Sequence, residues 1–296
     1  MNKKLMLIIN PAAGRGNYKE NFAEAMNILS NAGYVVSLFY TTGKEDATQY
    51  TVKYGSGFDV VACVGGDGTL SEVIAGLMQL DNPPPLGYFP MGTTNDVAMT
   101  LDIPKNDTVA AARLIIEGEP HSFDVGGFGK DKYFSYIAAF GAFTSVSYAT
   151  PQSQKKVLGH LAYVLQGAAE LPNIESYRTR VEFDDGIIDT KLVYGSMSNS
   201  KSVAGIVQLK EDVVCLGDGM SELVLVKDPG SIEGFGEIVS SILTKRYDSD
   251  KLIILHTKKA KFTFEKPVAW TRDGEDGGEH QEVELCNYSH RIKLIF

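Results

Sequence analysis

The first part of the chain alternates short apolar runs with stretches that place apolar residues at helical spacing. Strands are expected at residues 4–10, 34–40, 58–64 and 85–90. Helices are expected at residues 18–32, 95–101 and 107–117, with a further polar helix after Tyr40. The run FDVVACV is apolar almost throughout, which is typical of a strand buried on both faces. This alternation predicts a doubly wound parallel sheet, and such sheets bind ligands at the carboxyl ends of their strands.

After about residue 120 the pattern changes to a period of two. Apolar and charged residues alternate in SYRTRVEF, and DDG then turns the chain into IIDTKLVYGSM, which predicts a hairpin. Late strands are expected in KLIILH, AKFTFEK, QEVELC and RIKLIF, with helices near 154–171 and 231–244. We therefore expect an α/β domain over residues 1–122, which residues 287–296 could rejoin, and a mainly β domain over residues 123–286.

Charge and cysteine content narrow the classes of function. Lysine and arginine total 28 against 37 acidic residues, a formal charge of -9, which does not favour long-range attraction to nucleic acid or to anionic lipid. The three cysteines are scattered without CxxC spacing, so neither a disulfide framework nor a thiolate metal site is indicated. The apolar run at the N-terminus ends too early at Asn10 for a signal peptide or a membrane span. A cytoplasmic protein is expected.

One glycine loop stands out at the end of the third strand, in VVACVGGDGTLSEVIAG. It completes neither GxxxxGK[ST] nor GxGxxG, and HExxH and GxSxG are absent from the sequence, so four common catalytic and nucleotide motifs are excluded. Asp67 is unexpected in a phosphate loop, since a carboxylate repels a polyphosphate. It fits such a loop if Mg²⁺ or an ordered water lies between the two.

A structural interpretation of the same loop is also open. Thr69 followed by Glu72 has the spacing of a capping box, and the glycines could simply make a tight turn. The two interpretations are compatible, because the exposed N–H groups of a helix start form an anion site.

Two more polar glycine loops follow predicted strands: NPAAGRG at 10–16 and PMGTTNDVA at 90–98. Each alone could be a turn or a helix cap. Three such loops at one edge of a sheet are much less expected by chance than any one of them.

These motifs, followed by DGMSEL and RDGE in a β-rich second half, resemble the soluble bacterial diacylglycerol kinase and lipid kinase family. Its catalytic domain is shared with sphingosine kinases and more distantly with NAD kinases and phosphofructokinases. The resemblance covers essentially the whole chain. It implies a nucleotide-binding α/β domain beside a β-sandwich domain, ATP and Mg²⁺ as cofactors, and phosphoryl transfer to a lipid hydroxyl in a cleft between the domains.

The resemblance also implies site residues. Asp67 and Asp96 would lie near the triphosphate and its Mg²⁺. In the family the DGE turn carries the catalytic carboxylate, so Glu275 is the preferred general base and Asp273 the alternative or an organiser of metal and water; without the other motifs, RDGE would be read as an acidic β-turn. The nucleotide site would include Asn10, Gly14, Thr41, Gly65, Gly66, Asp67, Gly68, Thr69, Ser71, Thr93, Asn95 and Asp96.

A structural Mg²⁺ site is implied at Asp218 and at the main-chain carbonyls of Cys215 and Met220, since Mg²⁺ prefers oxygen ligands. Two positions depart from the family pattern: Ser71 replaces a usual Asn, and Glu222 replaces a usual Asp. These departures leave open a catalytically silent nucleotide- or lipid-binding regulator.

Diacylglycerol, converted to phosphatidic acid, is the acceptor that the resemblance favours, with a sphingoid base, another lipid or NAD as alternatives. A lipid substrate implies peripheral and transient contact with the inner face of the membrane, and the resemblance suggests a homodimer. Lysines such as Lys155 and Lys156 could meet anionic headgroups, although solvated lysines are the default interpretation.

Overall fold

The computed structural model describes residues 2–142, 175–199, 202–203, 207–208, 217–244 and 249–296. These residues form two compact units. The first runs to Val125 and also includes the short segment that ends at Gly219 and the C-terminal Tyr288–Phe296. The second consists of the other described residues between Gly126 and Asn287. The domain bounds expected from the sequence stay a prediction, because compactness does not show that either part folds alone.

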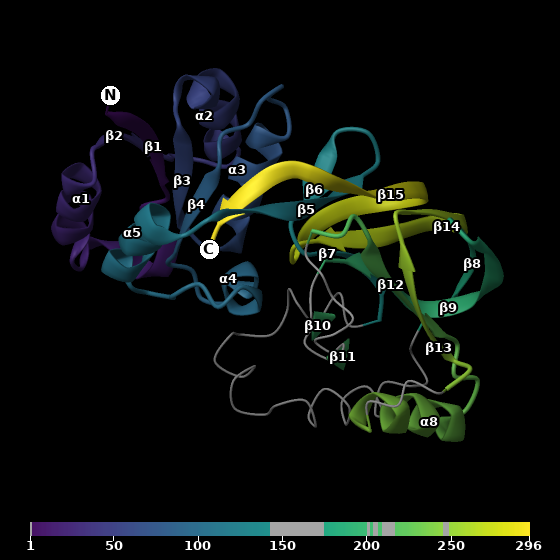
Figure 1. Ribbon diagram of the computed structural model, residues 1–296. Coiled ribbons are helices and arrows are strands. Elements are labelled where there is room, and N and C mark those ends of the chain that lie inside the picture. The colour runs from purple at the N-terminus through teal and green to yellow at the C-terminus, as the bar shows by residue number, and fades with distance from the viewer. Residues whose placement is uncertain (1, 143–174, 200–201, 204–206, 209–216, 245–248) are drawn as a thin grey trace. The chain divides into compact units, whose positions relative to one another are not determined.

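Four parallel strands form the sheet of the first unit, in the order β4-β3-β1-β2 (Figure 1). They are β1 (Lys3–Ile9), β2 (Tyr34–Tyr40), β3 (Val60–Gly65) and β4 (Leu86–Pro90). Leu7 of β1 pairs with Leu38 on one side and with Ala62 on the other. Every residue of β3 is buried, as expected of a central strand covered on both faces.

Helices cover both faces of this sheet (Figure 1). They are α1 (Phe22–Asn31), α2 (Asp46–Tyr54), α3 (Asp67–Leu77), α4 (Asp96–Thr100) and α5 (Thr108–Glu117), with 3-10 turns η1 (Ala13–Lys19) and η2 (Gly55–Gly57). The core between the sheet and the pair α1 and α5 contains Leu5, Leu7 and Ile9, which are alternate residues of β1. On the other face α2 packs closely on α3, where a Cβ on Gly76 would come within 2.5 Å of the Thr51 side chain.

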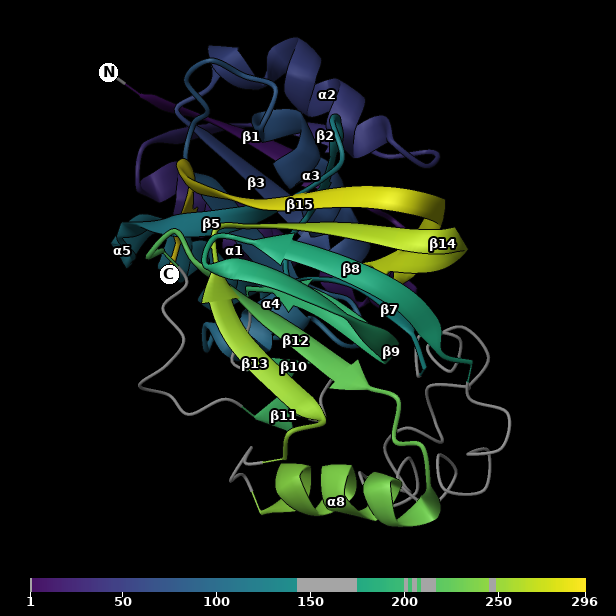
Figure 2. The same ribbon diagram turned by 90° about the vertical axis from the view of Figure 1, so that its right-hand side faces the viewer.

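The second unit is built mainly of antiparallel strands (Figure 2). Its strand order is β13-β12-β9-β7-β14-β15, and β8 pairs with both β9 and β14. The described elements are β5 (Pro120–Phe128), which enters from the first unit, β6 (Lys132–Phe134), β7 (Ile137–Gly141), β8 (Tyr177–Phe183), β9 (Gly186–Ser198), β10 (Ser202–Val203), β11 (Val207–Gln208), β12 (Ser221–Lys227), α8 (Ile232–Leu243), β13 (Leu252–Thr257), β14 (Lys259–Arg272) and β15 (Glu275–Ile295).

An aromatic cluster forms the core of the second unit. Trp270 and Phe140 are buried with ring centroids 4.9 Å apart, and Phe262 and Phe264 pack against both. These rings come from β7 and β14, which the sheet places side by side. The fold class predicted from the sequence, an α/β part followed by a strand-rich part, is confirmed.

The last strand is longer than the sequence predicted. QEVELC and RIKLIF read as two strands because polar residues separate them, but both belong to β15. Near its end Leu294 pairs in parallel with Leu86 of β4, so the C-terminal residues belong to the first unit. The expected helix at 231–244 is present as α8. The expected helix at 154–171 lies outside the described residues. Among the helices that the structure describes, none combines the length and apolarity that crossing a bilayer requires.

Candidate functional site

Three loops of the first unit meet at one edge of its parallel sheet. They follow β1, β3 and β4, and these strands are neighbours with the same direction. The N–H of Asn10 donates to the carbonyl of Val64 (3.0 Å), and the N–H of Met91 donates to the carbonyl of Gly65 (2.8 Å). The convergence expected from the sequence is therefore confirmed, at the edge where open α/β sheets bind ligands.

The second and third loops touch through their glycines. A Cβ on Gly92 would lie 2.4 Å from the Cα of Gly66, closer than real Cβ contacts allow. Gly65, one residue earlier, is equally confined, since a Cβ there would lie 2.4 Å from Oγ1 of Thr69. The main chain at Gly65 and Gly66, directly before α3, therefore carries no side chain, and glycine-rich backbone of this kind lets phosphate oxygens approach N–H groups.

The first loop is tied to the second by a side-chain pair. Asn10 Nδ2 donates to Oγ1 of Thr69 (3.1 Å), while Asn10 Oδ1 accepts from the N–H of Ala12 (3.0 Å). Gly14 in the same loop has φ of 55°, in the left-handed region that glycine adopts readily. The buried Thr41 lies at the end of β2, where its N–H donates to the carbonyl of Ile9 (2.9 Å). The structure thus brings Asn10 and Thr69 into direct contact, and Thr41 to the end of β1.

Asn95 holds the third loop in shape. Its Oδ1 accepts from the N–H of Gly92 (2.9 Å) and the hydroxyl of Tyr88 (3.3 Å), and its Nδ2 donates to the carbonyl of Gly92 (2.9 Å). The side chain is only 1% exposed. Its amide is thus occupied by the loop itself, whereas Thr93 and Gly68 are exposed at this edge. A helix-cap role for the Asn95 side chain is wrong, because no cap hydrogen bond is made to α4.

Two carboxylates give this edge a negative character. Asp67 is the first residue of α3 and Asp96 the first of α4, and both are half-buried. Burial, reinforced by the charges of Asp67, Cys63 and Asp96, raises the pKa of Tyr88 well above its usual range. Burial and the charge of Asp67 likewise raise the pKa of Cys63. Both carboxylates therefore act on the same buried surroundings, and a polyphosphate would need a cation to lie close to them.

The capping-box interpretation of Thr69 and Glu72 is wrong. The residue that precedes α3 is Gly66, so Thr69 already lies inside the helix. Glu72 instead reaches the neighbouring helix, where its carboxylate accepts from the N–H groups of Glu45 (3.0 Å) and Ala47 (3.2 Å) at the start of α2. Glu72 does satisfy N–H donors at a helix start, as a capping box would, but these donors belong to α2 and not to its own helix, α3.

In the second unit, RDGE forms the hairpin turn between β14 and β15. Arg272 pairs with Glu275, which leaves Asp273 and Gly274 as a two-residue turn with φ of 48° and 81°. Positive φ at both positions is the type I′ geometry that Asp-Gly favours. The sequence DG therefore determines the turn, and Glu275, the first residue of β15, is exposed next to it.

The carboxylate of Asp273 is enclosed by donors from one short segment. Its Oδ2 accepts from the N–H (2.6 Å) and the hydroxyl (2.8 Å) of Ser135, and its Oδ1 accepts from the N–H groups of Tyr136 (3.0 Å) and Ile137 (3.1 Å). The N–H of Asp273 in turn donates to the carbonyl of Ile137 (2.9 Å). These five bonds fix the turn to the segment that leads into β7.

The expected structural metal site is described only in part. Cys215 lies outside the described residues, and Asp218 is exposed. The carbonyl of Met220 accepts from Nδ2 of Asn287 (3.0 Å). In the first unit, the N–H of Gly219 donates to the buried carboxylate of Asp124 (2.8 Å). Within the part of the chain that the structure describes, no three or more His, Cys, Asp or Glu side chains gather as a metal site would require.

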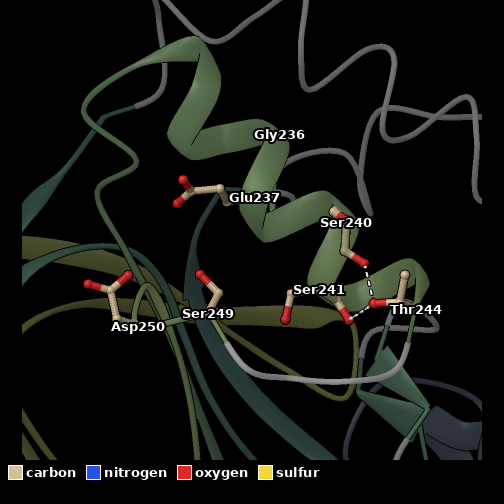
Figure 3. Close-up of a pocket in the computed structure, with 7 residues that line it drawn as sticks. All are labelled: Gly236, Glu237, Ser240, Ser241, Thr244, Ser249 and Asp250. Carbon is tan, nitrogen blue, oxygen red and sulfur yellow. Dashed lines mark hydrogen bonds between the residues drawn. The ribbon is translucent and has the colours of Figure 1, made fainter.

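A hollow of about 650 Å³ adjoins α8 (Figure 3). In the wall of this hollow, the hydroxyl of Thr244 donates to the carbonyl of Ser240 (2.7 Å). The hydroxyl and carboxyl groups of the described lining do not suit an acyl chain. The lining residues are Gly236, Glu237, Ser240, Ser241, Thr244, Ser249 and Asp250.

Sequence reasoning missed three residues that shape these sites. Ser135 and Asp273 are 138 positions apart, and only the pairing of β7 with β14 brings them together. Tyr88 lies inside an apolar run and gave no polar signal. Asn287 bonds Met220 across 67 positions. The sequence could not identify Ser135 and Asn287 because their hydrogen-bond partners are distant in the chain.

Comparison with solved structures identifies proteins of similar fold. Two solved structures are similar to this chain: a diacylglycerol kinase from Bacillus anthracis strain Sterne (TM-score 0.76, 22% identity, 99% of this chain and 97% of that one) and an NAD kinase from Archaeoglobus fulgidus in complex with ATP (TM-score 0.56, 14% identity, 99% and 93%). At these identities the likeness concerns the fold alone. The fold, with an α/β part and a strand-rich part, is the one that these two structures share.

Similarity in sequence is more specific. Residues 4–128 match the model of the diacylglycerol kinase catalytic domain. Over 293 residues the chain is 32% identical to a diacylglycerol kinase of Bacillus subtilis strain 168, covering 98% of this chain and 96% of the relative. The protein belongs to the diacylglycerol kinase family, and it is a kinase that phosphorylates an alcohol acceptor.

Proposed function

We propose that this protein is an ATP-dependent lipid kinase that transfers the γ-phosphate of ATP to the hydroxyl of diacylglycerol, giving phosphatidic acid. The observation that carries the proposal is the meeting of three glycine loops at one edge of the parallel sheet, in a chain similar over nearly its whole length to a diacylglycerol kinase.

The triphosphate is assigned to the bare backbone around Gly66 and Gly92. The N–H groups at the start of α3 supply donors, and the adjoining exposed positions Gly68 and Thr93 are accessible to a ligand. Asn10, Thr69 and Asn95 act in this proposal by holding the loops in place, since their side chains bond one another or the loop backbone. Gly14, Thr41, Gly65 and Ser71 complete the assigned set.

Asp67 and Asp96 fit a Mg²⁺ ion that accompanies the triphosphate. Mg²⁺ is commonly held by one or two carboxylates together with phosphate oxygens and water, and two half-buried carboxylates lie at this edge. The ion would supply neutralisation of charge on the transferred phosphoryl group. The second ion, at Asp218 and the carbonyls of Cys215 and Met220, stays part of the proposal.

Glu275 is the proposed general base. Asp273 is poorly suited, because each of its oxygens already accepts two hydrogen bonds and would have to lose one to take a proton. Glu275 follows the fixed turn and is exposed. In the proposed step its carboxylate takes the hydroxyl proton of the acceptor, a bond forms from that oxygen to the γ-phosphorus, and ADP leaves with the bridging oxygen.

A water-insoluble acceptor implies peripheral and transient contact of a cytoplasmic enzyme with the membrane that supplies it. A homodimer is likewise proposed.

The test is transfer of γ-labelled phosphate from ATP and Mg²⁺ to mixed micelles that contain dioctanoylglycerol, followed by extraction into organic solvent. Wild type and Glu279→Gln, an exposed acid on the same strand, should both label the organic phase. Glu275→Gln should lose labelling by at least about a hundredfold, the smaller end of the usual contribution of a general base, while still binding ATP.

Other outcomes would redirect the proposal. Label that stays in an aqueous product would indicate a soluble acceptor such as NAD. ATP binding without any product on a panel that includes sphingoid bases would indicate a silent regulator. Full activity of Glu275→Gln would exclude Glu275 as the base and return the role to Asp273.

A further inference from the structure

The parallel sheet of the first unit ends at β2 with an open edge. Among the strands that the structure describes, β2 pairs with β1 alone, and the strand order ends there. An edge strand presents a row of backbone N–H and C=O groups that can pair with another strand, and natural edges are commonly blocked by charges, proline or a bulge. The sequence YVVSLFY contains no charged residue and no proline, and its register with β1 runs unbroken from Tyr34 to Tyr40. This edge therefore lacks the usual protections.

Exposed apolar side chains gather at the same edge. Among the described residues, most of the large apolar side chains that are exposed belong to β2 and to the neighbouring α2. The two elements are in contact, since the rings of Phe39 and Tyr54 have centroids 5.4 Å apart. Exposed apolar patches of this kind mark interaction surfaces. The β2–α2 patch consists of Val35, Leu38, Tyr40, Val52 and Tyr54.

The open strand fits a second copy of itself. Most homo-oligomers are two-fold symmetric, so that the same surface of both subunits meets. Two β2 strands related by such an axis run antiparallel, and each residue then faces one from the same strand. In the register that pairs the whole strand, Ser37 lies at the axis and Leu38 faces Val36 of the partner subunit. A charge in the strand would lie near its own copy, which is destabilising, and YVVSLFY has none.

A lipid surface suits this edge less well. The outward N–H and C=O groups of an edge strand need hydrogen-bond partners, and hydrocarbon supplies none, which is why open sheet edges do not face lipid. A second β2 strand satisfies these groups and covers the apolar side chains at the same time. The main-chain groups and the side chains of the edge thus favour the same occupant.

We propose that the β2 edge and the β2–α2 patch form the interface of a homodimer, in which the parallel sheets of two subunits join into one continuous sheet. The patch on α2 widens the contact beyond the strand, since a stable interface buries roughly 800 Å² on each partner. The inference goes beyond the proposed function, because it assigns a surface to the dimer and does not depend on which acceptor is phosphorylated.

The first experiment measures the mass of the protein by sedimentation velocity over a range of concentrations. Wild type should form a dimer. Leu38→Lys should raise the dissociation constant at least about tenfold, because it places two lysines diagonally across the interface. Leu38 is 44% exposed within its own subunit, so the lysine reaches solvent without disturbing the fold. The matched control is Ile187→Lys, at a side chain of β9 that is 55% exposed, and it should leave the dissociation constant unchanged.

Ser37→Cys tests the same arrangement by a gain of signal. In the proposed register two copies of this residue face each other across the axis, where the Cβ atoms of opposed residues are about 5 Å apart. Mild oxidation should therefore link the two subunits covalently. Ser240→Cys, at an exposed serine of α8, should not link them, and wild type measures the background from its own cysteines.

Three outcomes would overturn the inference. They are a wild-type protein that stays monomeric, a dimer whose dissociation constant Leu38→Lys does not alter, and a Ser37→Cys variant that oxidation links no more than Ser240→Cys. A monomer that binds phosphatidylglycerol vesicles, and loses that binding in Leu38→Lys, would assign the patch to lipid instead. None of these results depends on the labelling assay, so the interface can fail while lipid phosphorylation stands, and the reverse.

Discussion

Gly66 and Gly92 approach each other backbone to backbone at the edge of the parallel sheet. A Cβ on Gly92 would lie 2.4 Å from the Gly66 Cα and 2.6 Å from Oδ1 of Asn95. Neither glycine has a positive φ, so the close approach and not an unusual turn requires glycine at both positions. The loops that follow β3 and β4 therefore contact each other directly through their main chains.

Gly92→Ala should therefore separate the loops. The extra methyl group meets main-chain atoms that cannot rotate away, so we expect a loss of stability of about 1–3 kcal/mol, the usual range for overpacking. ATP affinity should fall at least about tenfold if the loops form the phosphate site. Gly57→Ala is the matched control, since a Cβ there has no neighbour within 4 Å. Isothermal titration and thermal melts measure both effects, and unchanged ATP affinity in Gly92→Ala would contradict the site.

Asp273→Asn separates a structural from a chemical role for this carboxylate. Asparagine has one acceptor oxygen and turns an NH₂ group toward backbone donors, so we expect a loss of about 1–3 kcal/mol in stability, together with reduced activity. Ser135→Ala removes only one of the four donors and should cost less. Urea unfolding and the labelling assay measure the two quantities. A variant that is inactive yet as stable as wild type would make Asp273 a direct participant in proton transfer.

Alkaline pH should destabilise the second unit through Tyr194. Burial raises the pKa of this phenol to about 12 in the folded protein, from an ordinary value of 10. The stability associated with the neutral phenol is fully present below about pH 10 and is lost as pH rises toward 12, by roughly 1.4 kcal/mol for each unit.

Tyr194→Phe should flatten that decline. Between about pH 8 and pH 11, wild type should lose roughly 1 kcal/mol more than the variant in urea unfolding. Tyr40→Phe, at an exposed tyrosine, serves as control and should follow wild type. A decline that is the same in wild type and Tyr194→Phe would show that the buried phenol does not titrate as expected.

Glu72→Ala tests the unexpected link between α3 and α2. Loss of the acceptor for the N–H groups of Glu45 and Ala47 should destabilise the first unit by about 1 kcal/mol, the typical cost of a lost helix cap. Glu24→Ala, an exposed acid in the first turn of α1, should cost only a few tenths. Thermal melts measure the loss of stability in both variants. Equally small losses would indicate that the carboxylate of Glu72 is solvated and does not cap α2.

The amino-acid sequence by itself determined most of the fold of this protein and the location of its loops. Apolar periodicity depends on which face of an element is buried, so it predicted the strands of the first unit, α8 and the change to antiparallel strands. The glycine loops could be located because each follows a strand, and strand direction places them at one edge. The Asp-Gly turn is similarly local, since only the two turn residues need positive φ.

The tertiary structure alone decided which side chains share a hydrogen bond. Glu72 caps α2 and not its own helix because the sheet places α2 and α3 side by side. Asp273 is fixed by Ser135 because β7 pairs with β14. These contacts join residues up to 138 positions apart, and local periodicity carries no information on which distant strands become neighbours.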